Sequence, residues 1–142
     1  MTVPARISIV TLGVADVGRA AAFYEALGWE RAAASMDEIV WFHTADTNLG
    51  LWSSELLAAD ANLPAKRAAF GGVTLAINVE TAEEVQSVLD SVVAAGATLL
   101  KPATRAEWGG VSGYFADPDG HPWEVAHNPG FPIGNDGRVR ID

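Results

Sequence analysis

The sequence contains no cysteine, few basic residues and no long apolar run. The absence of cysteine excludes disulfides, thiolate catalysis and zinc bound through cysteine, and it is typical of a cytoplasmic protein. No stretch of about 18 apolar residues is present, so no membrane span is expected. Residues 1–10 also lack the basic region and apolar stretch of a secretory signal. We therefore expect a cytoplasmic protein without a membrane partner.

Basic residues are outnumbered by acidic ones, since 9 Lys and Arg stand against 18 Asp and Glu, a formal net charge of −9. A nucleic-acid backbone requires a basic surface, so we expect no nucleic-acid partner. Hydrophobic residues make up 49% of the 142 positions, which is enough for the core of one domain. The excess of acid is interpreted as a contribution to solubility.

Two segments of the chain carry the same order of structural signals. In the first, β-branched residues and alternation predict a strand over 7–14. Asp16 is a suitable N-cap for a helix whose apolar face comprises Val17, Ala20, Ala21, Tyr24 and Leu27, and Gly28 is a natural stop. Short strands are expected to follow over 29–34, 38–43 and 48–53.

The second segment repeats this order from residue 72. A strand over 72–79 is followed by a helix with Thr81 and Glu84 as a capping box and Gly96 as its stop. Strands are then expected over 97–102, 110–116 and 122–127, so each copy is β-α-β-β-β. We expect one domain over 1–142. It divides into a first module at 5–54, a linker at 55–71 with a short helix over 55–61, a second module at 72–128, and a C-terminal tail at 129–142.

A tight turn in the second segment places one carboxylate on a returning strand. In Asp117-Pro118-Asp119-Gly120 the proline presets φ for the first central position, and the glycine supplies a positive φ. The flanking alternation makes this a hairpin. Pro122, Glu124 and Ala126 lie on one face of the returning strand, with Trp123 and Val125 on the other.

Two motifs in the chain resemble a known family. Val14-Ala15-Asp16 followed by Ala-Phe-Tyr-Glu-Ala-Leu-Gly-Trp at 22–29 resembles the opening of the vicinal oxygen chelate superfamily. That superfamily includes glyoxalase I, extradiol dioxygenases and bleomycin-resistance proteins. The turn at 117–121 with Glu124 resembles its closing hairpin. The resemblance implies an α+β fold in which two tandem βαβββ modules form a curved sheet around a cavity. It also implies a homodimer.

The resemblance further implies where a metal would bind. Metal-dependent members place one ligand on the first strand and one on the last strand of each module. Here the first-strand positions are Ile9 and Thr74, residues 48–53 contain no carboxylate or histidine, and only Glu124 fills its place. A divalent ion needs three or four donors that converge on one point. We therefore predict no metal and no cofactor, with a site rebuilt from Glu124, His127 and a third residue as the alternative.

If the geometry of the superfamily holds, Glu124 points into the cavity. There it would be a catalytic general base or an anchor for a polar group of the ligand. The alternative is a structural acid that is solvated or paired with an arginine. Aromatic pockets with a few polar groups are typical small-molecule sites. The residues expected to bind a ligand are Thr11, Trp52, Thr74, Asn78, Trp108 and Tyr114.

Two functions are compatible with these residues. The favoured one is a glyoxalase-like protein that binds a small organic molecule in an aromatic-lined cavity without the usual divalent metal. The alternative is a metal-dependent lyase or isomerase of the glyoxalase I kind, with Glu124 as metal ligand or general base. The two hypotheses differ in whether purified protein holds a divalent ion.

Overall fold

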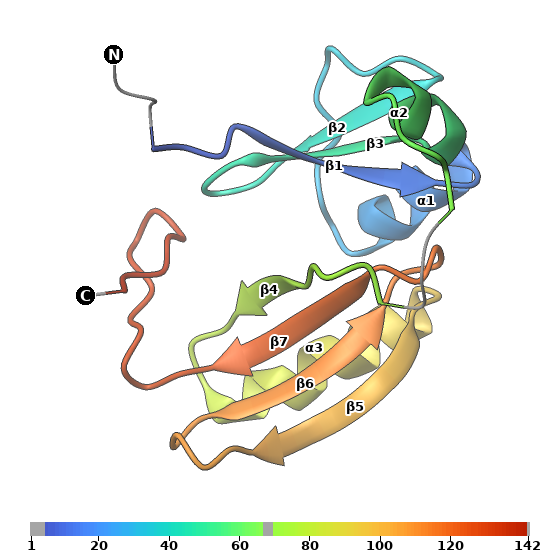
Figure 1. Ribbon diagram of the computed structural model, residues 1–142. Helices are drawn as coiled ribbons and strands as arrows, with labels where there is room; N and C mark the ends of the chain where they lie inside the picture. The colour runs from blue at the N-terminus through green and yellow to red at the C-terminus, as the bar shows by residue number, and fades with distance from the viewer. Residues whose placement is uncertain (1–4, 67–69, 142) are drawn as a thin grey trace. The chain divides into compact units, whose positions relative to one another are not determined.

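The computed structural model describes residues 5–66 and 70–141. The chain divides after Ala65 into two compact units, and each is described by itself. Each unit combines one sheet with helices (Figure 1). No helix among the described residues is long and apolar enough to cross a membrane.

The first unit contains β1 (Ile9–Val14), α1 (Val17–Ala26), β2 (Ile39–His43), β3 (Asn48–Ser53) and α2 (Ser54–Asp60). Its sheet has the order β1-β3-β2, with β3 parallel to β1 and antiparallel to β2. Helix α1 covers one face, where the Tyr24 ring contacts the Phe42 ring with centroids 5.9 Å apart. Leu12, Val14, Leu49 and Leu51 are buried on the same face, as strand alternation requires.

The prediction of a strand over 29–34 is wrong, because only an isolated β-bridge between Arg31 and Phe42 forms there. Residues 32–34 are alanines, which favour strands weakly. Ser35 takes over part of the pairing with β2: its hydroxyl accepts a hydrogen bond from Trp41 N at 2.9 Å and donates one to Trp41 O at 3.2 Å. The first sheet therefore has three strands instead of four.

The second unit contains β4 (Leu75–Asn78), α3 (Ala82–Ala94), β5 (Thr98–Arg105), β6 (Val111–Ala116) and β7 (Pro122–His127). Its sheet has the order β4-β7-β6-β5, with β4 parallel to β7 and the other pairs antiparallel. Helix α3 packs against β5, β6 and β7 (Figure 1). The three strands β1, β3 and β2 repeat the order and directions of β4, β7 and β6, which confirms the duplicated α+β fold, and β5 has no counterpart strand in the first sheet. Neither sheet closes into a barrel within the described ranges.

The main helix of each unit begins and ends in the same way. Asp16 Oδ1 accepts from Arg19 N at 2.9 Å, and Thr81 Oγ1 accepts from Glu84 N at 3.3 Å. At the other ends Gly28 and Gly96 have φ of 88° and 117°. The residue after each glycine donates back across the last turn, Trp29 to Tyr24 and Ala97 to Val92. These are Schellman motifs, so the glycine stops predicted from the sequence are confirmed.

The hairpin of β6 and β7 is fixed by one buried acid. Asp117 is 3% exposed, and its Oδ1 accepts from the backbone N–H groups of Asp119 and His121 at 2.9 Å each. Gly120 has φ of 84° and donates to Asp117 O. The side chain thus mimics a backbone turn and pairs two N–H groups inside the hairpin. This turn sets the register of every pair between the two strands.

Strand β5 lies at the edge of its sheet and is irregular. Its register against β6 shifts twice, between Leu99 and Lys101 and between Lys101 and Thr104. Pro102 cannot donate to the ladder, and the following N–H, of Ala103, donates instead to Gln86 Oε1 of α3 at 3.2 Å. An irregular, proline-containing edge is a common protection against pairing with another chain.

Gly113 of β6 lies where helix α3 and strand β5 approach this strand closely. A Cβ there would stand 2.5 Å from Leu89 Cδ1 and 2.8 Å from the carbonyl oxygen of Lys101. We predict that Gly113→Ala lowers the free energy of unfolding by about 1–3 kcal/mol, because the backbone of β5 must move. Gly71→Ala is the matched control, since nothing lies within 4 Å of its Cβ position. Urea titration followed by tryptophan fluorescence measures both, and equal stability of the two variants would contradict the packing described.

Candidate functional site

The face of the second sheet that α3 leaves open carries the polar residues of interest. Gly113 points to Leu89 of α3, so its neighbour Tyr114 leaves the opposite face of β6. On β7, Trp123 and Val125 are buried, and Trp123 stacks on Phe115 with centroids 6.1 Å apart. Glu124 therefore lies on the open face, as alternation predicts from the sequence.

Tyr114 and Glu124 form the centre of this face. They are directly opposite each other in the β6–β7 ladder, and Ala76 is opposite Glu124 on β4. The Tyr114 hydroxyl donates to Glu124 Oε2 at 3.2 Å. Both residues are half-buried. Within the described part of the chain Glu124 has no other hydrogen bond and no ion pair, so the arginine partner considered from the sequence is not found there.

The pKa of Tyr114 is raised above its ordinary value. Burial of the phenol is the largest cause, because it disfavours the charged phenolate. The negative charge of Glu124 and the hydrogen bond to its carboxylate act in the same direction. Tyr114 therefore remains a protonated donor, and its hydroxyl is held toward the acid.

The pair offers hydrogen-bond acceptors to a ligand. An ionised carboxylate has about four lone-pair positions, and Tyr114 uses one of them. Glu124 Oε1 and the free lone pair of the Tyr114 oxygen can accept from a hydroxyl, amine or amide N–H. A ligand carboxylate or phosphate would instead be repelled by the acid. The Glu124 carboxylate could also receive a proton from a bound ligand, which is the chemistry of a general base.

The other predicted residues of this unit lie farther from the pair. Asn78 ends β4 on the same face, opposite Ala126. Thr74 precedes β4 and is exposed. Trp108 lies in the turn between β5 and β6, 52% exposed, with its ring over Gly110. Their role in binding stays a prediction.

Thr11 and Trp52 lie on the first sheet, on the face that α1 leaves open. Thr11 is opposite Gly50, and Gly13 is opposite Trp52. Trp41 of β2 shares this face, because it is also opposite Gly50. The sequence alone did not assign Trp41 to either face.

The two sheets can be compared position by position through their registers. The row Tyr114, Glu124 and Ala76 in the second sheet corresponds to the row Trp41, Gly50 and Thr11 in the first. Gly50 therefore stands at the place of Glu124. It has no side chain, so the last strand of the first unit contributes no donor at that position.

The part of the chain that the structure covers contains no alternative group of metal ligands in place of the family's usual ones. No group of three His, Asp or Glu side chains suited to a metal ion occurs in residues 5–66 and 70–141. His127 leaves β7 on the face opposite to Glu124, and its Nδ1 lies 3.2 Å from Val79 O. His43 lies on the first sheet, with its Nδ1 3.3 Å from Asn48 Oδ1. The alternative site of Glu124 with His127 is therefore not formed.

Comparison with known proteins gives the family. The family model of the Glyoxalase/Bleomycin resistance protein/Dioxygenase superfamily matches residues 6–125. The chain belongs to this superfamily. The resemblance in the two sequence motifs is thereby confirmed. No curated protein matches the chain.

Solved structures of the glyoxalase superfamily share the fold. A glyoxalase-related enzyme from Fulvimarina pelagi is 37% identical, with a TM-score of 0.87, over 97% of this chain and 99% of that one. A lactoylglutathione lyase from Agrobacterium tumefaciens is 26% identical, with a TM-score of 0.66, over 88% and 95% of the two chains. A glyoxalase/bleomycin resistance protein/dioxygenase family enzyme from Burkholderia phytofirmans is 20% identical, with a TM-score of 0.73, over 87% and 98%.

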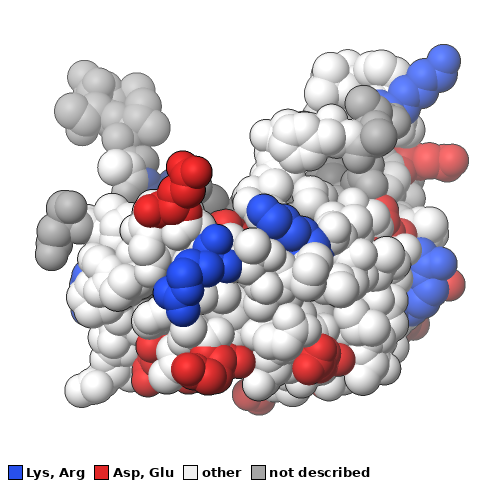
Figure 2. Space-filling model, turned by 90° about the horizontal axis from the view of Figure 1, so that it is seen from below, with Lys and Arg blue, Asp and Glu red and all other residues white. Residues whose placement is uncertain are grey.

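Charged side chains are dispersed on the surface drawn in Figure 2. Acidic and basic residues form small separate groups among uncharged ones on this face. This arrangement differs from the continuous basic surface that a nucleic-acid backbone requires.

The pairing of Tyr114 with Glu124 was missed at the level of sequence, although both residues were named. The sequence does contain the information needed to predict this pairing. Tyr114 and Glu124 are the same number of residues before and after Asp119, which lies at the centre of the turn. In a hairpin, the turn fixes the register. The side-chain role of Asp117 was also missed, although the residue begins the recognised turn motif at 117–120, and the role of Gly50 was missed because it belongs to no recognised motif.

Removal of the Glu124 charge provides a test of the pair. We predict that Glu124→Gln lowers the pKa of Tyr114, because the phenolate no longer faces a carboxylate. The pKa should remain above its ordinary value, since burial is the largest cause and is unchanged. Ultraviolet titration of the phenolate measures the shift, with Tyr114→Phe to separate it from Tyr24 and the exposed Glu80→Gln as control. An unchanged Tyr114 titration in Glu124→Gln would show that the contact is absent in solution.

Proposed function

We propose that this protein binds a small organic molecule through Glu124 and Tyr114, without the divalent metal of the superfamily's metal-dependent members. The observation that supports this most strongly is the donor set. At the four positions that the superfamily uses for metal ligands, Ile9 has no donor atom, Thr74 has a neutral hydroxyl, and Gly50 has no side chain. Only Glu124 remains.

One carboxylate is a poor site for a divalent ion. Catalytic sites for zinc and similar metals use at least three protein ligands. Glu124 instead has a neutral phenol as its neighbour, which stabilises the acid without replacing a metal. The residues at these positions therefore do not fit the metal that the family implies.

The character of the pair indicates what it would bind. A half-buried carboxylate with one partner gains a further hydrogen bond when a ligand supplies an N–H or O–H group. Hydrogen bonds to charged groups contribute about 1.5–3 kcal/mol, which is enough to orient a small molecule. We infer a ligand that carries a hydroxyl, amine or amide group, and Glu124 as its anchor.

A ligand screen tests this proposal. Neutral and cationic organic compounds are screened by quenching of tryptophan fluorescence, with wild-type protein in the presence of EDTA. We expect compounds with N–H or O–H groups to bind despite the chelator. Glu124→Gln should weaken their binding about tenfold or more, and Tyr114→Phe by about two- to tenfold. Glu80→Gln, which removes an exposed acid of the same unit, should leave the affinity unchanged.

Two outcomes would overturn the proposal. One is binding that appears only after a divalent metal is added, which would favour the metal-dependent lyase or isomerase. The other is a set of bound compounds whose affinity is the same in wild type and Glu124→Gln. Turnover of a bound compound in EDTA that is lost in Glu124→Gln would support the proposed site and identify Glu124 as its base.

A further inference from the structure

Strand β5 places one basic residue on the same face of the second sheet as Glu124. The register of β5 against β6 pairs Leu99 with Phe115 and Lys101 with Tyr114. Directly opposite residues of an antiparallel pair lie on one face of the sheet, so Lys101 shares the open face with Tyr114. The Lys101 side chain is exposed.

An irregularity at Leu100 causes this placement. Phe115 is buried on the side of α3, and so its partner Leu99 lies on that side. In a regular strand Lys101 would follow Leu99 to the same side, because side chains repeat every two residues. The register shift between them makes Leu100 the extra residue of a β-bulge, and such bulges redirect side chains at the edges of sheets. The bulge therefore directs Lys101 away from α3 and toward the open face.

The open face of the second sheet thus carries one acid and one base in a single row. Across β4, β7, β6 and β5, which lie side by side in Figure 1, the row is Ala76, Glu124, Tyr114 and Lys101. Glu124 is the only Asp or Glu in these four strands. The other basic residue of β5, Arg105, is opposite the buried Val111 on the side of α3. Neighbouring strands are about 4.8 Å apart, so about 10 Å separates the backbones of Glu124 and Lys101.

The two charged side chains do not pair with each other. The row places Tyr114 between them, and its hydroxyl donates to Glu124 Oε2 at 3.2 Å. Lys101 forms no ion pair with another residue of the ranges 5–66 and 70–141. Both charges are therefore available to a ligand, at the two ends of a row that has an aromatic ring in its middle.

We propose that Lys101 is a specificity-determining residue of the Glu124 site, and that the ligand is a zwitterion with its ammonium at Glu124 and its carboxylate at Lys101. This inference rests on the proposed function, because Glu124 is the anchor in both. A ligand carboxylate is repelled by Glu124 and attracted by Lys101, so a molecule with both groups binds in one orientation. Charge complementarity of this kind contributes more to specificity than to affinity.

Three aromatic compounds test the proposed ligand class. In 4-(aminomethyl)benzoate the ammonium and the carboxylate lie at opposite ends of a ring, whereas benzylamine has the ammonium alone. In 2-(aminomethyl)benzoate the two groups are adjacent and do not span the row. Binding to the full chain is measured by calorimetric titration in EDTA at low ionic strength, where exposed charges are screened least. We expect 4-(aminomethyl)benzoate to bind more tightly than the other two compounds.

Variants of two basic residues in the same strand assign the effect to Lys101. Lys101→Met keeps an apolar stem and removes the charge. It should weaken 4-(aminomethyl)benzoate about two- to fivefold, as expected for an exposed ion pair, and leave benzylamine unchanged. Arg105→Met is the matched control, because it removes a cation from the other face of β5 and should change neither affinity.

Reversal of the charge gives a readout that lost folding cannot imitate. Lys101→Glu should bind 1,4-bis(aminomethyl)benzene, which carries two ammonium groups, more tightly than wild type does, and 4-(aminomethyl)benzoate more weakly. Three results would overturn the inference. They are equal affinity of wild type and Lys101→Met for 4-(aminomethyl)benzoate, an equal loss in Arg105→Met, and no preference of wild type for this compound over benzylamine.

The failure of this inference differs from failure of the proposed function. If benzylamine and 4-(aminomethyl)benzoate both depend on Glu124 and neither depends on Lys101, only the inference is wrong. If 4-(aminomethyl)benzoate depends on Lys101 while Glu124→Gln binds both compounds as wild type does, the role of Glu124 is wrong, and the zwitterion proposal fails with it.

Discussion

The register of one hairpin determines the chemistry of the second unit. Asp117 accepts two backbone N–H groups within the turn and so fixes which residues of β6 and β7 face each other. A shift by one residue would move Glu124 to the helix-covered face, where an unpaired carboxylate is costly. With the observed register, Tyr114 and Glu124 meet on the open face, and the phenol hydroxyl reaches the acid at 3.2 Å. The buried Asp117 thus determines where Glu124 lies relative to Tyr114.

The two units have related folds but carry different residues at corresponding positions of their sheets. The two units share the order of three strands, side-chain N-caps on their main helices and helix ends that depend on glycine. They differ at the centre of their open faces, where Gly50 stands in one sheet and Glu124 in the other. Metal binding requires several donors at one point, and Gly50 has no side chain that could supply one. The space above Gly50 is occupied instead by the indole of Trp41.

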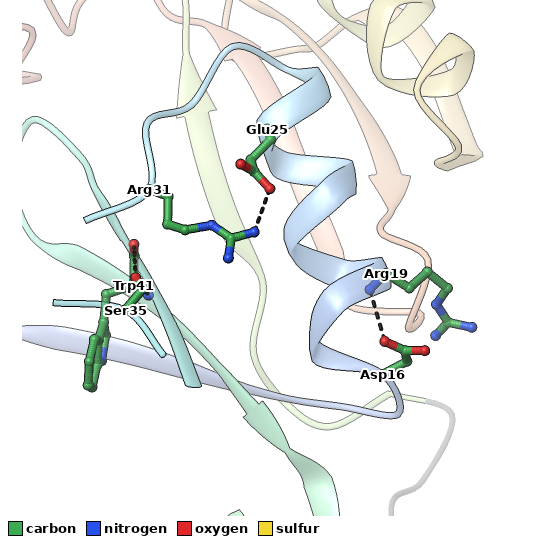
Figure 3. A network of polar contacts seen from close by, with 6 residues as sticks. All are labelled: Asp16, Arg19, Glu25, Arg31, Ser35 and Trp41. Carbon is green, nitrogen blue, oxygen red and sulfur yellow. Dashed lines mark hydrogen bonds and ion pairs between the residues drawn. The ribbon is translucent and has the colours of Figure 1, made fainter. Parts of the chain in front are cut away.

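Much of this organisation could be predicted from residues alone. The caps Asp16 and Thr81, the stops Gly28 and Gly96, and the turn before Glu124 are local signals, and each was confirmed. The strands over 48–53 and 122–127 have the predicted bounds. The prediction of a strand over 29–34 was wrong because the pairing of this segment depends on β2 and on the Ser35 side chain, which Figure 3 shows beside the Trp41 backbone. A local sequence pattern contains no information about these contacts. The sequence likewise could not predict on which face of the sheet Trp41 lies, because that face is determined by the long-range pairing with Gly50.

The candidate site was less predictable than the fold, for a physical reason. Sequence motifs identify individual residues that could bind or react. A site depends in addition on which of these residues lie next to each other on neighbouring strands. Glu124 and Tyr114 were both named, yet their hydrogen bond follows from register. Thr74 and Trp108 were named by position and composition, and they lie outside the strands.

We propose that Glu124 lacks the further ligands that a divalent ion requires. Elemental analysis of purified protein, combined with calorimetric titration with Ni²⁺, Zn²⁺ and Mg²⁺, tests it most directly. We predict substoichiometric metal in the purified protein and no saturable binding that differs between wild type and Glu124→Gln. One ion per chain, bound tightly by wild type and lost in Glu124→Gln, would contradict the claim.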